Sequence, residues 1–149
     1  MTLSAQDLAD LRQLASRYWA MADLLEEIPL DELFDSDAVF DLGKLRLEGL
    51  DAIARFFAER AEGMRESGRT TRHLATNFLV FSESEDRVRI RSTVTVYAAT
   101  GALPLEAGAP SGIADFEDIC HRQPDGSWRY HYRSGRTVFA GPNAASFAR

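Results

Sequence analysis

The chain has 149 residues, of which 45% are hydrophobic and 27% charged, and its formal net charge is −6. This length fits one globular domain, residues 1–149, and an acidic chain without a basic run is a poor binder of nucleic acid. The single cysteine, Cys120, excludes an intramolecular disulfide, and the absence of a long apolar run argues against a membrane span, so a cytoplasmic protein is expected.

A long amphipathic helix is predicted over residues 5–27. Its apolar side chains recur at spacings of three and four, which places them on one helical face: Leu8, Leu11, Ala15, Tyr18, Ala22 and Leu25. Ser4 is suited to cap its start, and Pro29 to end it.

Shorter elements follow in the middle of the chain. The segment LDELF predicts a short helical turn, residues 37–42 predict a strand, and GKLRLEG predicts a turn with a second short strand. A further helix is predicted over residues 51–66, and Gly68 lies just past its end.

The second half of the chain reads as four long strands rich in Val, Ile, Thr, Phe and Tyr, over residues 70–82, 87–99, 112–123 and 127–139. Helices followed by a run of antiparallel strands predict an α+β fold, with the helices against the concave face of a curved sheet. Such a face encloses a pocket that is usually apolar with a few polar groups. The C-terminal segment GPNAASFAR is predicted to be loosely ordered.

Five segments in the right order make the chain resemble the SnoaL-like group of the nuclear transport factor two-like superfamily. They are RYWAMAD, LFDSDAVFDL, LEGLDAIARFF, RTTRHLATN and DFEDICHRQPDGSWRYHYR. The resemblance implies a cone-shaped α+β barrel whose N-terminal helices close the concave face. The same fold carries dehydratases, isomerases, cyclases, hydrolases and non-catalytic subunits, so the fold alone does not name an activity.

Within that superfamily, the resemblance to scytalone and bile-acid dehydratases implies three catalytic candidates. They are His73 on the first long strand, with Tyr18 and Asp23 from the first helix. A late-strand arginine of the bile-acid enzymes has its match in Arg136, and the strand aspartate of ketosteroid isomerases has its match in Asp118.

The chemistry of these residue types fits proton transfer. Imidazole exchanges a proton near neutral pH, so His73 is a natural general base and acid, while Asp23 would orient the ring and Tyr18 would hold a substrate oxygen. Five residues of ideal helix place Asp23 about 140° from Tyr18, so either the helix unwinds before Pro29 or only one of the two reaches the pocket. The plainer alternative is a structural histidine, a solvated helix acid and a core tyrosine.

Further residues are candidates for substrate binding. Trp19, Phe40, Phe56 and Tyr97 would line the pocket with aromatic rings, and Asn77, four residues after His73 on the same predicted strand face, could hold an oxygen or occupy a bulge. Asp118 could donate a hydrogen bond if buried, but pairing with Arg133 or Arg136 on the neighbouring strand is the simpler expectation.

No cofactor is expected, since the chain lacks a glycine-rich phosphate loop and the HExxH and GxSxG motifs, and no metal is expected from His73, His121 and His131 at their spacing. Leu74, Phe78 and Val80 are expected on one face of a strand and Leu79 and Phe81 on the other, which predicts a homodimer through the outer face. The sequence thus favours a cofactor-independent dehydratase, isomerase or cyclase acting on a small hydrophobic ring-containing molecule. A non-catalytic binding module, or a structural subunit of an oxygenase, is the alternative.

Overall fold

Two long helices and six strands make up the computed structural model, which describes residues 2–148. Their order matches the predicted order of elements throughout. The elements are α1 (Ala5–Ala22), η1 (Leu30–Glu32), β1 (Phe34–Asp41), β2 (Arg46–Glu48), α2 (Leu50–Ser67), β3 (Arg69–Ser84), β4 (Arg87–Thr100), β5 (Gly112–Arg122), β6 (Trp128–Ala140) and η2 (Ser146–Ala148).

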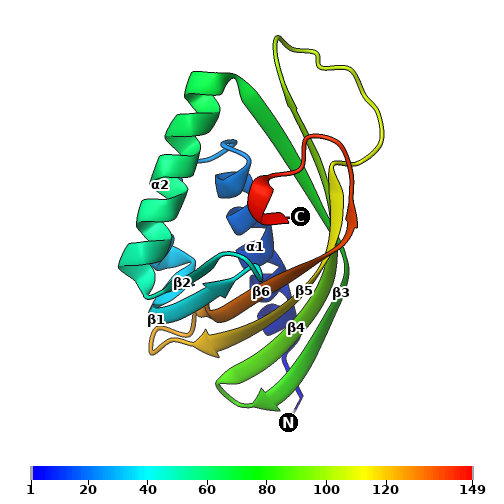
Figure 1. Ribbon diagram of the computed structural model, residues 1–149. Helices are drawn as coiled ribbons and strands as arrows, with labels where there is room; N and C mark the ends of the chain where they lie inside the picture. The colour runs from blue at the N-terminus through cyan, green and yellow to red at the C-terminus, as the bar shows by residue number, and fades with distance from the viewer. Residues whose placement is uncertain (1, 149) are drawn as a thin grey trace.

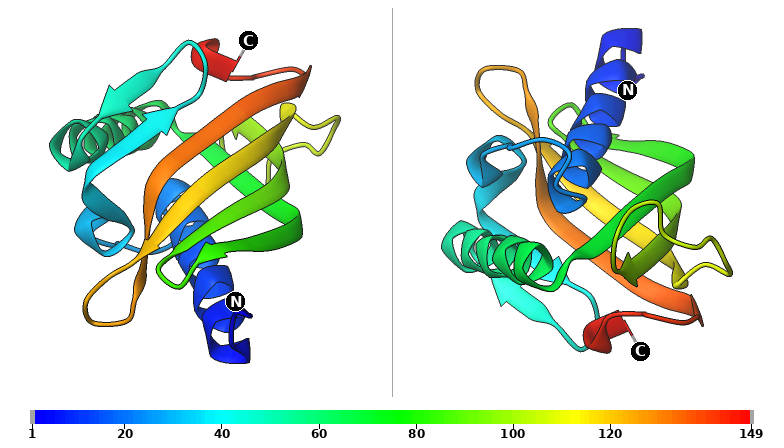
Figure 2. Two further views of the ribbon diagram at one scale, coloured as in Figure 1. Left: turned by 90° about the horizontal axis from the view of Figure 1, so that it is seen from below. Right: turned by 90° about the horizontal axis from the view of Figure 1, so that it is seen from above.

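The strands form one open, strongly curved sheet in the order β2-β1-β6-β5-β4-β3. The four long strands pair antiparallel, as predicted, while β1 joins β6 in parallel, so the sheet is mixed. Both helices lie on the concave side, and the chain forms the cone-shaped α+β fold (Figures 1 and 2). No helix in the described range is long and apolar enough to cross a membrane.

Helix α1 starts as predicted and ends five residues early. The hydroxyl of Ser4 accepts from the backbone N–H of Asp7 at 3.0 Å, and the Asp7 carboxylate accepts from the backbone N–H of Ser4 at 3.1 Å, which forms a capping box. At the other end, Asp23 is the C-cap and Leu24 has a left-handed φ of 57°. The prediction of a helix to residue 27 was therefore wrong, and Leu25 is exposed rather than on the buried face.

A bulge in β3 changes which side chains face the cone. Asn77 has a φ of 54°, and the pairing of β3 with β4 shifts register between Thr76 and Leu79. Because a bulge inserts one residue, the alternation of side chains reverses after it. Phe78 and Val80 consequently pack against the core, while Leu74, Leu79 and Phe81 are exposed on the outer face. The expectation that Leu74 shares a face with Phe78 and Val80 was wrong for this reason.

Candidate functional site

The carboxylate of Asp23 and the imidazole of His73 are in direct contact. Asp23 Oδ1 lies 2.6 Å from His73 Nδ1, and Asp23 Oδ2 accepts the backbone N–H of His73 at 2.8 Å. The hydroxyl of Thr71 donates to Asp23 Oδ1 at 2.8 Å. One carboxylate therefore receives three hydrogen bonds from two alternate residues of β3.

The contact joins the C-terminal end of α1 to the start of β3. Asp23 is the C-cap, and its backbone N–H still donates to the carbonyl of Trp19 at 2.9 Å, so its side chain lies one turn after Trp19, on the side that faces β3. Thr71 and His73 are two residues apart on a strand and so present their side chains to the same face. Of the two alternatives that the 140° angle left open, the structure shows the second: Tyr18 lines the cavity and Asp23 does not, so Asp23 acts on the cavity through His73.

Hydrogen bonding fixes the charge of Asp23 and the tautomer of His73. Burial alone would raise the pKa of Asp23, but the hydrogen bonds and charge interaction with His73 outweigh burial, and the pKa is lowered. An ionised carboxylate only accepts hydrogen bonds, so the neutral His73 ring carries its proton on Nδ1. Its other nitrogen, Nε2, then has a free lone pair and can act as a base.

Trp19 holds the imidazole from its flat side. The two rings stack with their centroids 4.4 Å apart and an interplanar angle of 19°. Trp19 is on α1, one turn before the Asp23 cap, so a single helix end supplies both the stacking ring and the orienting carboxylate. Two contacts therefore orient His73: stacking on Trp19 fixes the plane of the ring, and the hydrogen bond to Asp23 fixes how the ring is turned within that plane.

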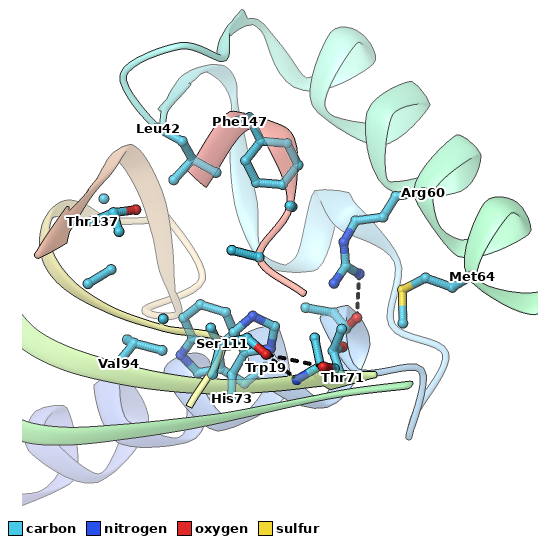
Figure 3. A pocket seen from close by; sticks show the side chains of 18 of the residues that line it. Trp19, Leu42, Arg60, Met64, Thr71, His73, Val94, Ser111, Thr137 and Phe147 are labelled. Carbon is cyan, nitrogen blue, oxygen red and sulfur yellow. Dashed lines mark hydrogen bonds between the residues drawn. The ribbon is translucent and has the colours of Figure 1, made fainter. Parts of the chain in front are cut away.

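His73 lines a cavity of about 330 Å³ inside the cone. Tyr18, Trp19, Phe40 and Phe56 contribute aromatic surface to it, as the sequence predicted. The C-terminal segment, predicted to be loose, folds back over the cavity, and Phe147 meets Phe56 edge to face at 6.0 Å (Figure 3). A space of this size with apolar walls suits a small ring-containing molecule.

Tyr18 is almost fully buried between the helices and the sheet. Its ring makes edge contacts with those of Trp19, Phe57 and Tyr130. Burial raises the pKa of its hydroxyl, with Arg133 acting in the opposite direction, so the hydroxyl remains a hydrogen-bond donor at neutral pH. Tyr18 is thus both a core residue and part of the cavity wall.

A buried ion pair packs against the rings of Tyr18 and Trp19. Arg133 donates to Asp118 at 2.8 Å, which agrees with the predicted cross-strand pairing of Asp118. The Arg133 guanidinium also lies 4.0 Å from the centre of the Tyr18 ring and 5.0 Å from that of Trp19. Burial raises the pKa of Asp118 to about 7, and Arg133 opposes this rise. Asp118 is in the core and does not line the cavity.

Besides Asp118, three predicted binding residues lie away from the cavity. Asn77 is exposed at the bulge, and Tyr97 is 40% exposed. Arg136 contacts Asp41 at 3.5 Å. The bulge between β5 and β6 near Ile119 explains why Arg133, rather than Arg136, points inward.

Several functional candidates were missed. Thr71 and Phe147 gave no sequence signal, since a threonine is ordinary in a strand and the C-terminal tail lacks periodicity. Arg60 was visible as a charged residue on the apolar face of α2, and that position is the signal that it lines a cavity.

A separate group of ligand-type side chains lies at the bulged junction of β1, β5 and β6. Ligand atoms of Asp35, His121 and His131 all lie within 4.8 Å of one another. The two imidazoles stack at 4.1 Å and 16°, and Nδ1 of each lies near Oδ2 of Asp35, at 3.6 Å for His121 and 3.0 Å for His131. A guanidinium nitrogen of Arg87 lies 3.2 Å from Nε2 of His121, and His131 pairs with Asp35 at 3.0 Å. The cluster as arranged is a network of hydrogen bonds and ion pairs.

Comparison with known proteins identifies the family. The family model described as "SnoaL-like domain" matches residues 4–134. Among curated proteins, none matches the chain. The family and the cavity together support a small-molecule-binding or catalytic fold.

Solved structures agree with this fold. A putative scytalone dehydratase from Novosphingobium aromaticivorans is 20% identical with a TM-score of 0.74, over 93% of this chain and 89% of the other. ActVI-ORFA from Streptomyces coelicolor is 13% identical with a TM-score of 0.75, over 93% and 100%. A protein of unknown function from Mycobacterium tuberculosis is 22% identical with a TM-score of 0.73, over 97% and 85%. At these identities the likeness concerns the fold.

Proposed function

Because the chain belongs to the SnoaL-like domain family, we propose that it is a cofactor-independent acid–base enzyme acting on a small, hydrophobic, ring-containing molecule. The observation that carries this proposal is the Asp23–His73 pair at the wall of an apolar cavity. A histidine whose Nδ1–H is held by a buried carboxylate has its second nitrogen available as a base.

In the proposed reaction, Nε2 of His73 removes a proton from the carbon next to a substrate carbonyl. The electron pair of the C–H bond moves into an enolate, and Tyr18 donates a hydrogen bond to the oxygen that becomes negative. Asp23 stabilises the imidazolium that forms. The imidazolium then returns its proton to a leaving hydroxyl, which departs as water, or to another carbon, which shifts the double bond. In a cyclisation, the enolate carbon attacks a second carbonyl and the proton goes to its oxygen.

Deuterium exchange tests this proposal without knowledge of the natural substrate. The protein is incubated in deuterated buffer with cyclic ketones such as tetralone and indanone, and mass spectrometry follows the gain of deuterium next to the carbonyl. The wild-type chain should accelerate exchange, and His73→Ala should fall to the rate without protein. His131→Ala, which removes a histidine outside the cavity, is the matched control and should retain the wild-type rate.

Two results would contradict the proposal. One is exchange that is no faster with the wild-type protein than without it across the ketones, and the other is exchange unaffected by His73→Ala. In either case the cavity would be left as a binding site without proton-transfer chemistry.

A further inference from the structure

Two arginines line the apolar cavity on the side formed by α2 and the start of β3. Arg60 projects from α2 into the cavity (Figure 3), and Arg69 is the first residue of β3. Both are partly buried, and their charges are close enough that Arg69 contributes to lowering the pKa of Arg60, after the larger effect of burial.

Neither guanidinium has an acidic partner within ion-pair distance among residues 2–148. Arg60 donates to the backbone carbonyl of Ala22, and Arg69 donates to that of Asn143 at 2.8 Å. Asp23, the acid whose charge acts on Arg60, already receives hydrogen bonds from Thr71 and His73. A guanidinium has five N–H donors, so each arginine retains donors beyond its carbonyl contact.

The two charged side chains identified at this cavity are positive, whereas the chain as a whole is acidic. The whole chain has a net charge of −6, yet one apolar space is lined by two arginines that have no acidic partner in the described part of the chain. Partial removal of a cation from water is unfavourable unless an anion compensates it. A ligand that brings its own negative charge would supply that compensation.

We infer that Arg60 and Arg69 form an anion subsite, and that the molecule in the cavity is a ring compound bearing a carboxylate. The planar guanidinium of arginine matches the two oxygens of a carboxylate, and the aromatic walls take the ring. This inference rests on the proposed function in that it specifies the substrate class of the same cavity. It concerns binding only and is measured without turnover.

Binding of naphthoate and of its neutral amide separates charge recognition from ring recognition. Trp19 is in the cavity wall, so quenching of tryptophan fluorescence reports occupancy. At about pH 8, where naphthoate is ionised, the wild-type chain should bind naphthoate more tightly than naphthamide. Arg60→Gln, which keeps a donor for the Ala22 carbonyl, should weaken naphthoate binding about tenfold or more, because hydrogen bonds to charged groups are the stronger class. It should leave naphthamide binding unchanged.

Two control variants define the site. Arg65→Gln removes an exposed arginine of the same helix outside the cavity and should not alter either affinity. His73→Ala should keep the preference for naphthoate, which separates this subsite from the proposed base. The inference is overturned if the wild-type chain does not prefer naphthoate, or if Arg60→Gln weakens both ligands equally. A wild-type chain that prefers naphthoate but does not accelerate deuterium exchange would contradict the proposed function alone.

Discussion

Asp23 accepts two hydrogen bonds from His73, one from the ring at 2.6 Å and one from the backbone at 2.8 Å. The backbone contact attaches the end of α1 to β3, and the ring contact selects the tautomer. A single carboxylate thereby fixes both the position of the strand and the direction of the imidazole. Such double attachment reduces the freedom of the base before a substrate arrives, which favours proton transfer.

Replacing His73 by alanine tests the role of the imidazole. Positioned proton transfer contributes about 100- to 10,000-fold to a rate, so His73→Ala should reduce exchange or turnover by about that factor. The backbone N–H of His73 and the hydroxyl of Thr71 still bind Asp23 in this variant, so circular dichroism should show an intact fold. Near wild-type rates in a folded His73→Ala protein would contradict the assignment.

Asp23→Asn should reduce the rate less than His73→Ala, because the base remains while its orientation and the stabilisation of the imidazolium weaken. The variant should also be less stable above about pH 4, since a carboxylate with a lowered pKa stabilises the fold above its unfolded pKa of about 3.9. That stability difference should shrink as pH falls through the pKa of the folded state. Urea unfolding of both proteins at several pH values measures it, and a difference that grows toward acid would be inconsistent.

Asp118→Asn tests the buried pair with Arg133 through its pH dependence. Burial raises the pKa of Asp118 to about 7, whereas the unfolded value is about 3.9. Between these values the folded chain binds more protons than the unfolded chain, so this group lowers the free energy of unfolding as pH rises. Asparagine does not titrate and removes that slope.

The free energy of unfolding of Asp118→Asn, minus that of wild type, should therefore be larger at about pH 8 than at about pH 5, so the variant is relatively more stable at the higher pH. Asp115→Asn, which changes an exposed aspartate of the same strand, is the matched control for urea unfolding. A variant that loses more stability at the higher pH would instead indicate a carboxylate that stays ionised against Arg133 throughout.

The outer face of β3 leads us to propose a homodimer. Leu74, Leu79 and Phe81 are 50%, 58% and 39% exposed there, on a strand at the edge of the sheet. Burying this apolar row against a second copy would remove it from water. Light scattering at micromolar concentration should give twice the chain mass, and Leu79→Glu should shift the protein to monomer. A monomeric wild-type protein would refute the proposal.

Much of the fold could be predicted because periodicity reports which face of each element is buried. The four long strands and the start of α1 at Ser4 followed from local patterns. The family resemblance added the catalytic candidates Tyr18, Asp23 and His73; in the structure Tyr18 and His73 line one cavity, and Asp23 contacts His73 from outside it.

Three of the errors share a physical cause, which is that bulges and helix ends depend on tertiary contacts. After the bulge at Asn77, the side chains of β3 that would face outward face the core instead. After the bulge near Ile119, Arg133 points inward and Arg136 outward. Helix α1 ends where Asp23 finds hydrogen bonds on β3, which no local pattern encodes.

Long-range proton–nitrogen NMR of the His73 imidazole tests most directly whether Asp23 holds this ring as a base that faces the cavity. The His73→Ala spectrum assigns its signals. For neutral His73, the account predicts a proton on Nδ1 and none on Nε2, together with a shift of the Nε2 signal when naphthoate enters the cavity. A neutral ring with its proton on Nε2 would contradict the account, because Nδ1 could then not donate to Asp23 and the nitrogen proposed as the base would have no free lone pair.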